Sequence, residues 1–225
     1  KEYSGLLNKS ISVNSRTASK DVFAGDPYPY ESPDTTHFSV MDQYGNAVSN
    51  TYTLNFSYGS GIMIPGTGML MNNEMDDFSS KPGVPNGYGL LGSEANSIES
   101  NKRPLSSMTP TIIFKDNKPY LVLGSPGGSR IITTVLQVAL NVLEHDMSVK
   151  QAVVSPRVHH QWLPDVLLME EGFSPDTVTL LEKMGHTIRS SRTMGSVQAI
   201  IYKDKYFYGA ADPRRPSSGA VAVNP

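Results

Sequence analysis

Thr35-Thr36-His37-Phe38-Ser39-Val40 is the stretch that decides the fold, because two hydroxyl residues stand directly before a segment with strand character. Strand-like residues run from His37 to Asp42 and from Ala47 to Asn55, with turn-forming residues at 43–46 between them. The pattern predicts a β-hairpin that starts at Thr35. A threonine in this position is either an ordinary strand residue or, once a cut exposes its α-amine as a base, a nucleophile.

The segment before the hairpin is polar and rich in proline. Residues 25–34 contain three prolines, which favour extended backbone and oppose helix. We therefore expect residues 1–34 to form an exposed tail or linker, a setting that suits proteolytic processing. Because the chain begins with Lys1 rather than Met, we also expect it to be part of a longer product.

The composition excludes several classes of protein. A length of 225 residues, 38% of them apolar, suits one globular domain. A formal net charge of -2 with scattered Lys and Arg argues against a nucleic-acid partner. The absence of cysteine excludes disulfides, thiolate metal sites and a cysteine nucleophile. The longest apolar run, residues 131–143, contains Thr, Gln and Asn and is too short to span a bilayer, so we expect no stable membrane insertion.

Further strands and helices predict a layered α+β domain. A second hairpin is expected from Thr111–Lys115 and Tyr120–Gly124, joined by a turn at 116–119. Apolar residues at helical spacing predict a helix over 131–143, with Ser129 as its N-cap. The remaining predicted elements are helices at Val149–Val154 and from Ser174 to about Met184, and strands at Val197–Tyr202 and Tyr206–Ala210. Residues 79–104 lack periodicity and are expected to form a functional loop.

Three further motifs could carry chemistry. Two glycines in Ser125-Pro126-Gly127-Gly128-Ser129 could turn backbone N–H groups toward an anion or oxyanion, or could simply form a tight turn. The carboxylates of Glu74, Asp76 and Asp77 could bind an ammonium group or a hard cation, or could be a solvated surface turn. The adjacent hydroxyls of Ser106 and Ser107 could hold a carboxylate.

A metal site at His159-His160 is not favoured. Adjacent histidines on a strand point to opposite faces, and the sequence offers no obvious third ligand. We therefore expect neither a metal nor a cofactor.

Taken together, these segments resemble the C-terminal, small-subunit half of γ-glutamyltranspeptidases, which belong to the N-terminal-nucleophile hydrolases. The stretches that carry the resemblance are Thr35–Val40, Gly45–Val48, Thr51–Asn55, Asn72–Phe78, Lys102–Pro110, Gly124–Thr134 and Asp212–Arg214. The resemblance implies a four-layer αββα sandwich completed by a large subunit that this chain lacks. It also implies that residues 1–34 are the end of the large subunit and that 35–225 form the small-subunit catalytic domain.

For catalysis, the resemblance implies that the precursor cuts itself between Asp34 and Thr35. Thr35 then attacks the γ-carbonyl of a donor such as glutathione, and water or the amine of an amino acid or peptide resolves the ester. The amides of Gly127 and Gly128 are implied to form the oxyanion hole, and Thr53 to hydrogen-bond the nucleophile.

For substrate binding, the resemblance places the donor's α-ammonium on Glu74 and Asp77 and adds a hydrogen bond from Asn55. Ser106 and Ser107 are implied to hold the donor's α-carboxylate, together with a large-subunit arginine that this chain lacks. Tyr88 matches the aromatic residue of a lid formed by the loop at about 79–104.

The resemblance also implies a heterodimer with the large subunit and export to the periplasm or outside the cell. Two alternatives stay open. One is a glutaryl or cephalosporin acylase with the same chemistry, whose substrate lacks the α-ammonium and would leave Glu74 and Asp77 without a partner. The other is a non-catalytic member of the family.

Overall fold

The predicted N-terminal hairpin forms in the computed structural model, which describes residues 11–19, 35–87 and 89–223. Strand β1 (Thr36–Met41) pairs antiparallel with β2 (Ala47–Tyr52). Their turn is held by the Asp42 carboxylate, which accepts the backbone N–H groups of Tyr44 and Asn46, both at 2.9 Å. Strand β2 is shorter than predicted and ends at Tyr52, because Asn55 at a φ of 73° turns the chain away.

A four-stranded antiparallel sheet lies against this hairpin. It is built in the order β3-β4-β8-β9 from β3 (Thr111–Lys115), β4 (Lys118–Gly124), β8 (Gln198–Lys203) and β9 (Tyr206–Ala211). The turn between β3 and β4 was predicted over 116–119, but only Asp116 and Asn117 form it, at φ values of 50° and 60°. Pro119 belongs to β4 and lies beside a register irregularity at Phe114, which accommodates its missing N–H.

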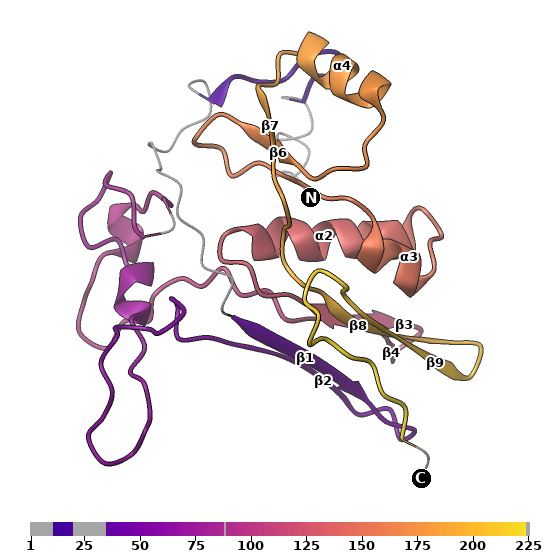
Figure 1. Cartoon of the computed structure of the whole chain (residues 1–225), viewed down its shortest axis with the longest axis horizontal. Helices are drawn as coiled ribbons and strands as arrows, with labels where there is room; N and C mark the ends of the chain where they lie inside the picture. The colour runs from indigo at the N-terminus through magenta and orange to yellow at the C-terminus, as the bar shows by residue number, and fades with distance from the viewer. Residues whose placement is uncertain (1–10, 20–34, 88, 224–225) are drawn as a thin grey trace.

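Two helices cover the other face of this sheet and enclose the core. They are α2 (Arg130–Leu143) and α3 (Val149–Val154), both close to their predicted bounds. The buried side chains between sheet and helices are apolar: Leu121, Leu123, Ile131, Val135, Val138, Val142, Val149, Ala152, Val153, Val197, Ala199, Ile201 and Ala210. Figure 1 shows the resulting three layers, with the β1–β2 hairpin below the sheet and α2 and α3 above it. The described residues therefore supply three of the four expected layers.

The interface between hairpin and sheet is polar rather than apolar. The Ser39 hydroxyl donates to the carbonyl of Gln198 (3.0 Å), and the Ser49 hydroxyl donates to the carbonyl of Leu123 (2.9 Å). Nε2 of the buried His37 lies 3.0 Å from the Ser39 hydroxyl, which has already used its proton, so Nε2 is the protonated ring nitrogen. Burial lowers the pKa of His37 to about 4. The ring also packs on Gly124, where a Cβ would come within 2.2 Å of it.

A small third sheet was not predicted from the sequence. Strands β5 (Val158–His159), β6 (Leu167–Met169) and β7 (Ile188–Ser190) form it in that order, and α4 (Pro175–Lys183) connects β6 to β7. Helix α4 starts as expected, because the Ser174 hydroxyl accepts the N–H of Thr177 and Pro175 occupies the first turn. None of the helices in the described part of the chain combines the length and apolar character needed to cross a membrane.

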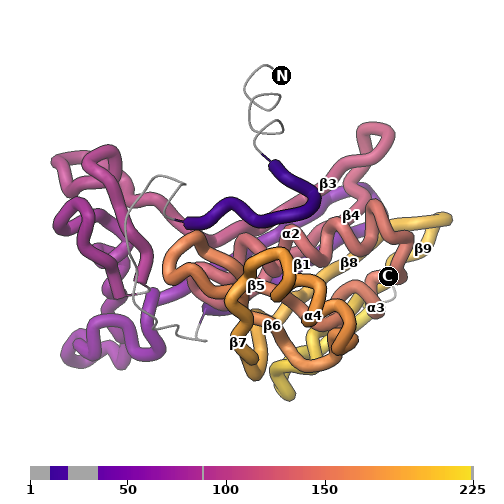
Figure 2. Tube along the Cα trace, turned by 90° about the horizontal axis from the view of Figure 1, so that it is seen from above, coloured from indigo at the N-terminus to yellow at the C-terminus, as the bar shows by residue number. Residues whose placement is uncertain are grey.

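Residues 11–19 run along the outside of the molecule and are largely exposed, as expected, but they are also anchored (Figure 2). The Arg16 guanidinium donates to the Asp165 carboxylate at 2.6 and 2.7 Å and to the carbonyl of Gly185 at 2.6 Å. The indole of Trp162 donates to the carbonyl of Ser19. A segment before the predicted cleavage site is thus attached to the part of the chain that follows it.

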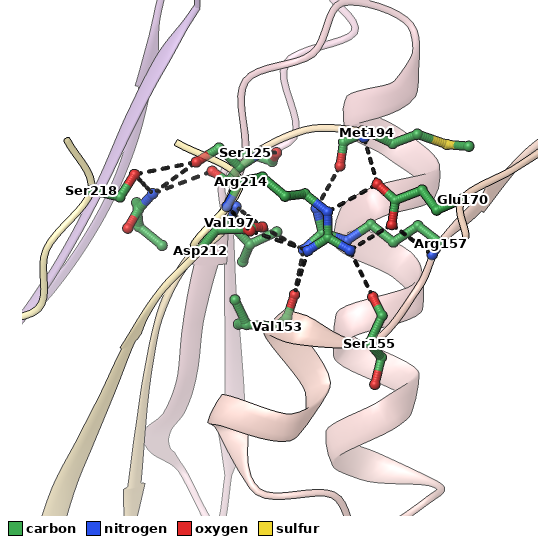
Figure 3. A network of polar contacts seen from close by, with 12 residues as sticks. Ser125, Val153, Ser155, Arg157, Glu170, Met194, Val197, Asp212, Arg214 and Ser218 are labelled. Carbon is green, nitrogen blue, oxygen red and sulfur yellow. Dashed lines mark hydrogen bonds and ion pairs between the residues drawn. The ribbon is translucent and has the colours of Figure 1, made fainter. Parts of the chain in front are cut away.

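A buried ionic network ties the C-terminal segment to the core (Figure 3). Arg157 is 1% exposed and donates to the Asp212 carboxylate at 2.6 Å, while Arg214 forms ion pairs with both Asp212 and Glu170. Burial alone would raise the pKa of Asp212. The charge of Arg157 and the hydrogen bond from the N–H of Val197 outweigh burial and hold this pKa below its ordinary value. The network therefore fixes residues 212–214 against α3 and the small sheet.

Candidate active site

Thr35 lies directly before β1, is 3% exposed, and is held through both its side chain and its backbone. Its hydroxyl donates to the hydroxyl of Thr53 at 3.2 Å, and its carbonyl accepts a 2.9 Å bond from Nη1 of Arg215. Thr53 Oγ1 also accepts the backbone N–H of Asn55 at 2.8 Å. Pairing of Thr36 with Tyr52 across the hairpin brings Thr35 and Thr53 side by side.

A small pocket opens beside Thr35. Its lining residues are Thr35, Thr53, Asn55, Glu74, Asp77, Ser106, Ser107, Met108, Gly128 and Ile131. The structure thus brings together most of the predicted site residues, which are separated by up to 93 positions in the sequence. Gly127 is not part of the lining, and Asp34 and Tyr88 lie outside the described residues.

The glycine turn between β4 and α2 forms one wall of the pocket. Gly127 and Gly128 have φ values of 137° and 55°, a conformation in which glycine avoids the strain of a side chain. Ser129 occupies the N-cap position of α2 as predicted, but its side chain does not cap the helix, and its hydroxyl donates to Oε1 of Gln161 at 2.7 Å. Helix α2 starts without a side-chain cap from Ser129, immediately behind the turn.

Gly195 supports this turn from behind, and no motif in the sequence indicates that role. A Cβ at Gly195 would lie 2.5 Å from the Ser125 hydroxyl and 3.1 Å from the Pro126 carbonyl oxygen. The same close approach places a Cβ of Gly127 3.3 Å from the Cα of Gly195. The glycine turn therefore depends on a glycine far away in the sequence.

The three carboxylates of the acidic turn, those of Glu74, Asp76 and Asp77, have different surroundings. Glu74 and Asp77 line the pocket, whereas the Asp76 carboxylate accepts the backbone N–H of Gly87 at 2.9 and 3.1 Å and so holds the long loop. Burial and the charge of Asp77 raise the pKa of Glu74 to about 7. Burial and the charge of Asp76 raise the pKa of Asp77 to about 6. Two desolvated carboxylates side by side favour a bound cation.

Glu74 has an unsatisfied atom that points to the same conclusion. Its Oε1 is buried and has no hydrogen-bond partner within the ranges that the structure describes. A buried carboxylate oxygen without a donor is costly, and an ammonium group would satisfy it. The pocket lining holds no Lys or Arg that could supply the positive charge.

Asn55 and the two serines complete the pocket lining. Asn55 is buried at a φ of 73°, and its side chain donates to the carbonyl of Asn73 at 3.2 Å, beside the acidic turn. The Ser106 hydroxyl accepts the N–H of Met108 at 3.2 Å, which leaves its proton to donate to a ligand. The lining thus contains both carboxylates and hydroxyl donors.

Sequence reasoning missed Met108, Ile131 and Arg215 as residues of this region. Met108 follows the paired serines, and Ile131 was expected only as a core residue of the helix. Arg215 follows the Asp212-Pro213-Arg214 motif, but nothing in the sequence connects it to Thr35. Only the folded chain brings these three residues next to the predicted site residues.

The two rings of the His159-His160 pair contact different protein groups. Nδ1 of the buried His159 lies 2.7 Å from the Thr133 hydroxyl, and its Nε2 lies 3.0 Å from Oε1 of Gln161. Within 11–19, 35–87 and 89–223, no group of three His, Cys, Asp or Glu residues is arranged to hold a metal ion. Burial lowers the pKa of His159 to about 4, so the ring is neutral and structural.

Comparisons with known proteins identify the family and the fold of this chain. The sequence pattern of the family described as gamma-glutamyltranspeptidase matches residues 1–222. A glutathione hydrolase proenzyme of Escherichia coli is 54% identical over 215 residues, which are 95% of this chain and 37% of that protein. A solved γ-glutamyltranspeptidase structure from Helicobacter pylori has 59% identity and a TM-score of 0.77, and the match covers 80% of this chain and 100% of that one.

The fold is an α+β sandwich of the N-terminal-nucleophile hydrolase type. Within that class, the chain belongs to the γ-glutamyltranspeptidase family. A cephalosporin acylase from Bacillus halodurans has a TM-score of 0.78 at 23% identity, with coverage of 99% of this chain and 39% of that one, and shares the fold. The chain spans between a third and two fifths of the length of the curated relatives it matches.

Proposed function

We propose that this chain carries the catalytic centre of a γ-glutamyltransferase and glutathione hydrolase with Thr35 as its nucleophile. The observation that carries the proposal is the shared pocket of Thr35, Thr53, the Glu74/Asp77 carboxylates and the Ser106/Ser107 hydroxyls. Nucleophile, cation site and anion site lie around one space. Such an arrangement suits a small zwitterion whose other end carries the reacting carbonyl.

The nucleophile is proposed to arise by cleavage between Asp34 and Thr35. The Thr35 hydroxyl attacks the carbonyl of Asp34, the acyl group moves from nitrogen to oxygen, and water hydrolyses the ester. This step frees the α-amine of Thr35, which serves as the general base for its own hydroxyl. The relatives that match this chain are named proenzymes, which supports processing of this kind.

In the proposed acyl transfer, the α-amine takes the Thr35 proton while Oγ1 attacks the γ-carbonyl of the donor. The amides of Gly127 and Gly128 stabilise the oxyanion, and the amine returns the proton to the departing nitrogen. Thr53 accepts the hydrogen bond that orients Oγ1 toward the carbonyl. Water or an acceptor amine from an amino acid or peptide then attacks the γ-glutamyl ester.

Donor selection is proposed to follow from charge. The α-ammonium pairs with Glu74 and Asp77 and satisfies the buried Oε1 of Glu74, while Ser106 and Ser107 donate to the α-carboxylate. Asn55 contributes at the ammonium end. A glutaryl donor has no ammonium and would leave the two carboxylates desolvated, so it is the weaker candidate.

The partner is proposed to be the large subunit of the same precursor. The outward face of the hairpin exposes Phe38, Val40, Val48 and Tyr52, between 44% and 58% each. An apolar sheet face of this kind requires a cover, and the fourth layer of the sandwich would provide it. We further propose export to the periplasm or outside the cell, where glutathione donors and amino-acid acceptors would be the substrates.

The test uses the full-length precursor. N-terminal sequencing of the smaller fragment should start at Thr35, and turnover of a γ-glutamyl anilide should exceed turnover of the glutaryl anilide. Thr35→Ala should remain uncleaved and lose activity by about a thousandfold or more. Thr35→Ser, which keeps a hydroxyl, should retain part of the self-cleavage and part of the turnover. An intact Asp34–Thr35 bond in active protein, or unchanged activity of Thr35→Ala, would overturn the proposal. Greater glutaryl turnover would point to the acylase.

A further inference from the structure

The two parts of the proposed donor site come from segments that are far apart along the chain. Glu74 and Asp77 belong to the 3-10 helix η2 (Glu74–Asp77), and Ser106 and Ser107 follow the loop 79–104. Both sets line the same pocket. A donor with fixed spacing between its ammonium and carboxylate requires the protein to hold these segments at a fixed spacing as well.

The side chain of Asn96 connects the two segments. Its Nδ2 donates to the backbone carbonyl of Asp77 at 2.7 Å, and its Oδ1 accepts the backbone N–H of Leu105 at 3.0 Å. Asp77 is itself a pocket carboxylate, and Leu105 is the residue directly before Ser106. One amide group therefore bridges the cation side and the anion side of the site.

The backbone of Asn96 holds the bridge in place. Asn96 ends the 3-10 helix η3 (Glu94–Asn96), and its N–H donates to the carbonyl of Ser93 at 3.0 Å. Its carbonyl accepts the N–H of Ser79 at 2.9 Å, and Ser79 also forms a β-bridge with Ser97. Asn96 is half-buried and does not line the pocket, so it acts on the donor only through its neighbours.

The chemistry of the side chain suits this role. A bridge between a carbonyl and an N–H needs one donor and one acceptor on the same short group, which an asparagine amide supplies. Neither a carboxylate nor an aliphatic side chain can do both. Loss of the amide would free the two segments to move relative to one another without altering Thr35 or the glycine turn.

We propose that Asn96 is a positioning residue that sets the spacing between the ammonium-binding carboxylates and the carboxylate-binding serines, and thereby selects zwitterionic donors. The inference rests on the proposed function. It predicts that Asn96 matters for donors that use both parts of the site. A donor that uses only the serines does not depend on the spacing.

The experiment uses processed, full-length enzyme and two donors. A γ-glutamyl anilide carries both charges, and the matching glutaryl anilide lacks the ammonium. Asn96→Ala removes the bridge, and Asn96→Leu removes it while filling the space, so agreement between them attributes the effect to the lost amide. Asn101→Gly is the control, because Asn101 is an exposed residue of the same loop with a φ of 63° that glycine tolerates.

For both Asn96 variants, KM for the γ-glutamyl anilide should rise about 5- to 30-fold while kcat stays within about threefold, as two lost hydrogen bonds imply. The kcat/KM for the glutaryl anilide should be unchanged, and Asn101→Gly should match the wild type on both donors. Equal losses on both donors, or a fall in kcat at unchanged KM, would overturn the role of Asn96.

A second measurement separates this inference from the proposed function. Calorimetry measures the dissociation constants of glutamate and glutarate without turnover. The constant for glutamate depends on the spacing between the carboxylates and the serines, so only glutamate should bind more weakly to the Asn96 variants. If the wild type turns over the γ-glutamyl anilide but the variants match it throughout, only the role of Asn96 fails. If the wild type neither binds glutamate nor turns over the anilide, both proposals fail.

Discussion

The backbone carbonyl of Thr35 accepts a 2.9 Å hydrogen bond from Nη1 of Arg215, which lies 180 residues further along the chain. Arg215 follows Asp212 and Arg214, which the buried network with Arg157 and Glu170 holds in place. The C-terminal segment thus reaches from the core to the proposed nucleophile. Residues far from the pocket can therefore influence the geometry of Thr35.

Arg215→Ala should weaken both self-cleavage and turnover. A hydrogen bond from a charged group contributes about 1.5–3 kcal/mol, which corresponds to about a 10- to 150-fold loss when it positions the reacting residue. The fraction of cleaved precursor and kcat measure the two effects. Arg192→Ala is the matched control, because Arg192 is exposed. Cleavage and turnover within twofold of wild type would show that the contact does not position Thr35.

Gly195→Ala should disrupt the turn that carries Gly127 and Gly128. The new Cβ would lie 2.5 Å from the Ser125 hydroxyl and 3.0 Å from Cγ2 of Thr134, at a φ of 69°. Backbone strain at such a φ costs about 1–3 kcal/mol, and the clash adds to it.

Gly45→Ala separates strain from clash, because Gly45 has a φ of 89° but no neighbouring atom within 4 Å of the added Cβ. The midpoint temperature of thermal unfolding and kcat should both fall much further for Gly195→Ala than for Gly45→Ala. Equal effects would mean that the close packing behind the turn is unimportant.

Asp212→Asn should destabilise the protein strongly. The substitution leaves Arg157, 1% exposed, without its carboxylate partner. Breaking a buried ion pair from one side costs about 3–5 kcal/mol. Urea unfolding of the processed enzyme measures the loss, and Asp204→Asn, in the exposed turn between β8 and β9, serves as control. An unchanged urea midpoint for Asp212→Asn would contradict a stabilising role for the network.

Donor use should depend on pH through Glu74 and Asp77. Their pKa values are raised to about 7 and about 6, so both carboxyls lose their charge as the pH falls through this range. Because an ammonium binds the charged forms, kcat/KM for the γ-glutamyl anilide should rise between about pH 6 and pH 8.

The glutaryl anilide distinguishes this effect from titration of the Thr35 amine. Both donors need the neutral amine, but only the γ-glutamyl donor needs the carboxylates, so its acidic limb should be the steeper one. Glu74→Gln should flatten that limb. Identical pH profiles for the two donors would exclude a role for the carboxylates in donor binding.

The same shifts predict a change in stability. A carboxyl whose folded pKa exceeds its unfolded pKa holds its proton more tightly in the folded state, so the ligand-free protein should lose stability as the pH rises from about 4 to about 7. Glu74→Gln should reduce this loss, measured by thermal unfolding at several pH values. A steeper loss in the variant would contradict the raised pKa of Glu74.

Much of the local structure could be predicted from the sequence. The hairpin at Thr35, helices α2 and α3 and the start of α4 follow from alternation, helical spacing and an N-cap, all of which act between neighbouring residues. The strands β5, β6 and β7 could not be predicted, because elements of two or three residues have no periodicity to detect. The side chain of Ser129 does not cap α2, because its backbone is already helical (φ -58°, ψ -26°) rather than extended as in a capping residue, and its hydroxyl is oriented toward Gln161.

The sequence by itself determined the chemical parts: a threonine before a strand, a glycine turn before a helix, an acidic turn and paired serines. These are set by residue type and by contacts between near neighbours. Only the tertiary structure decided how the parts meet, through Arg215 on Thr35, Gly195 behind Gly127 and Asn96 between Asp77 and Leu105. The contacts of Arg215 and Gly195 join residues distant in the chain, and they form only when packing of the layers brings these residues together. Asn96 acts over shorter separations, and its contacts depend on how the long loop folds back on the acidic turn.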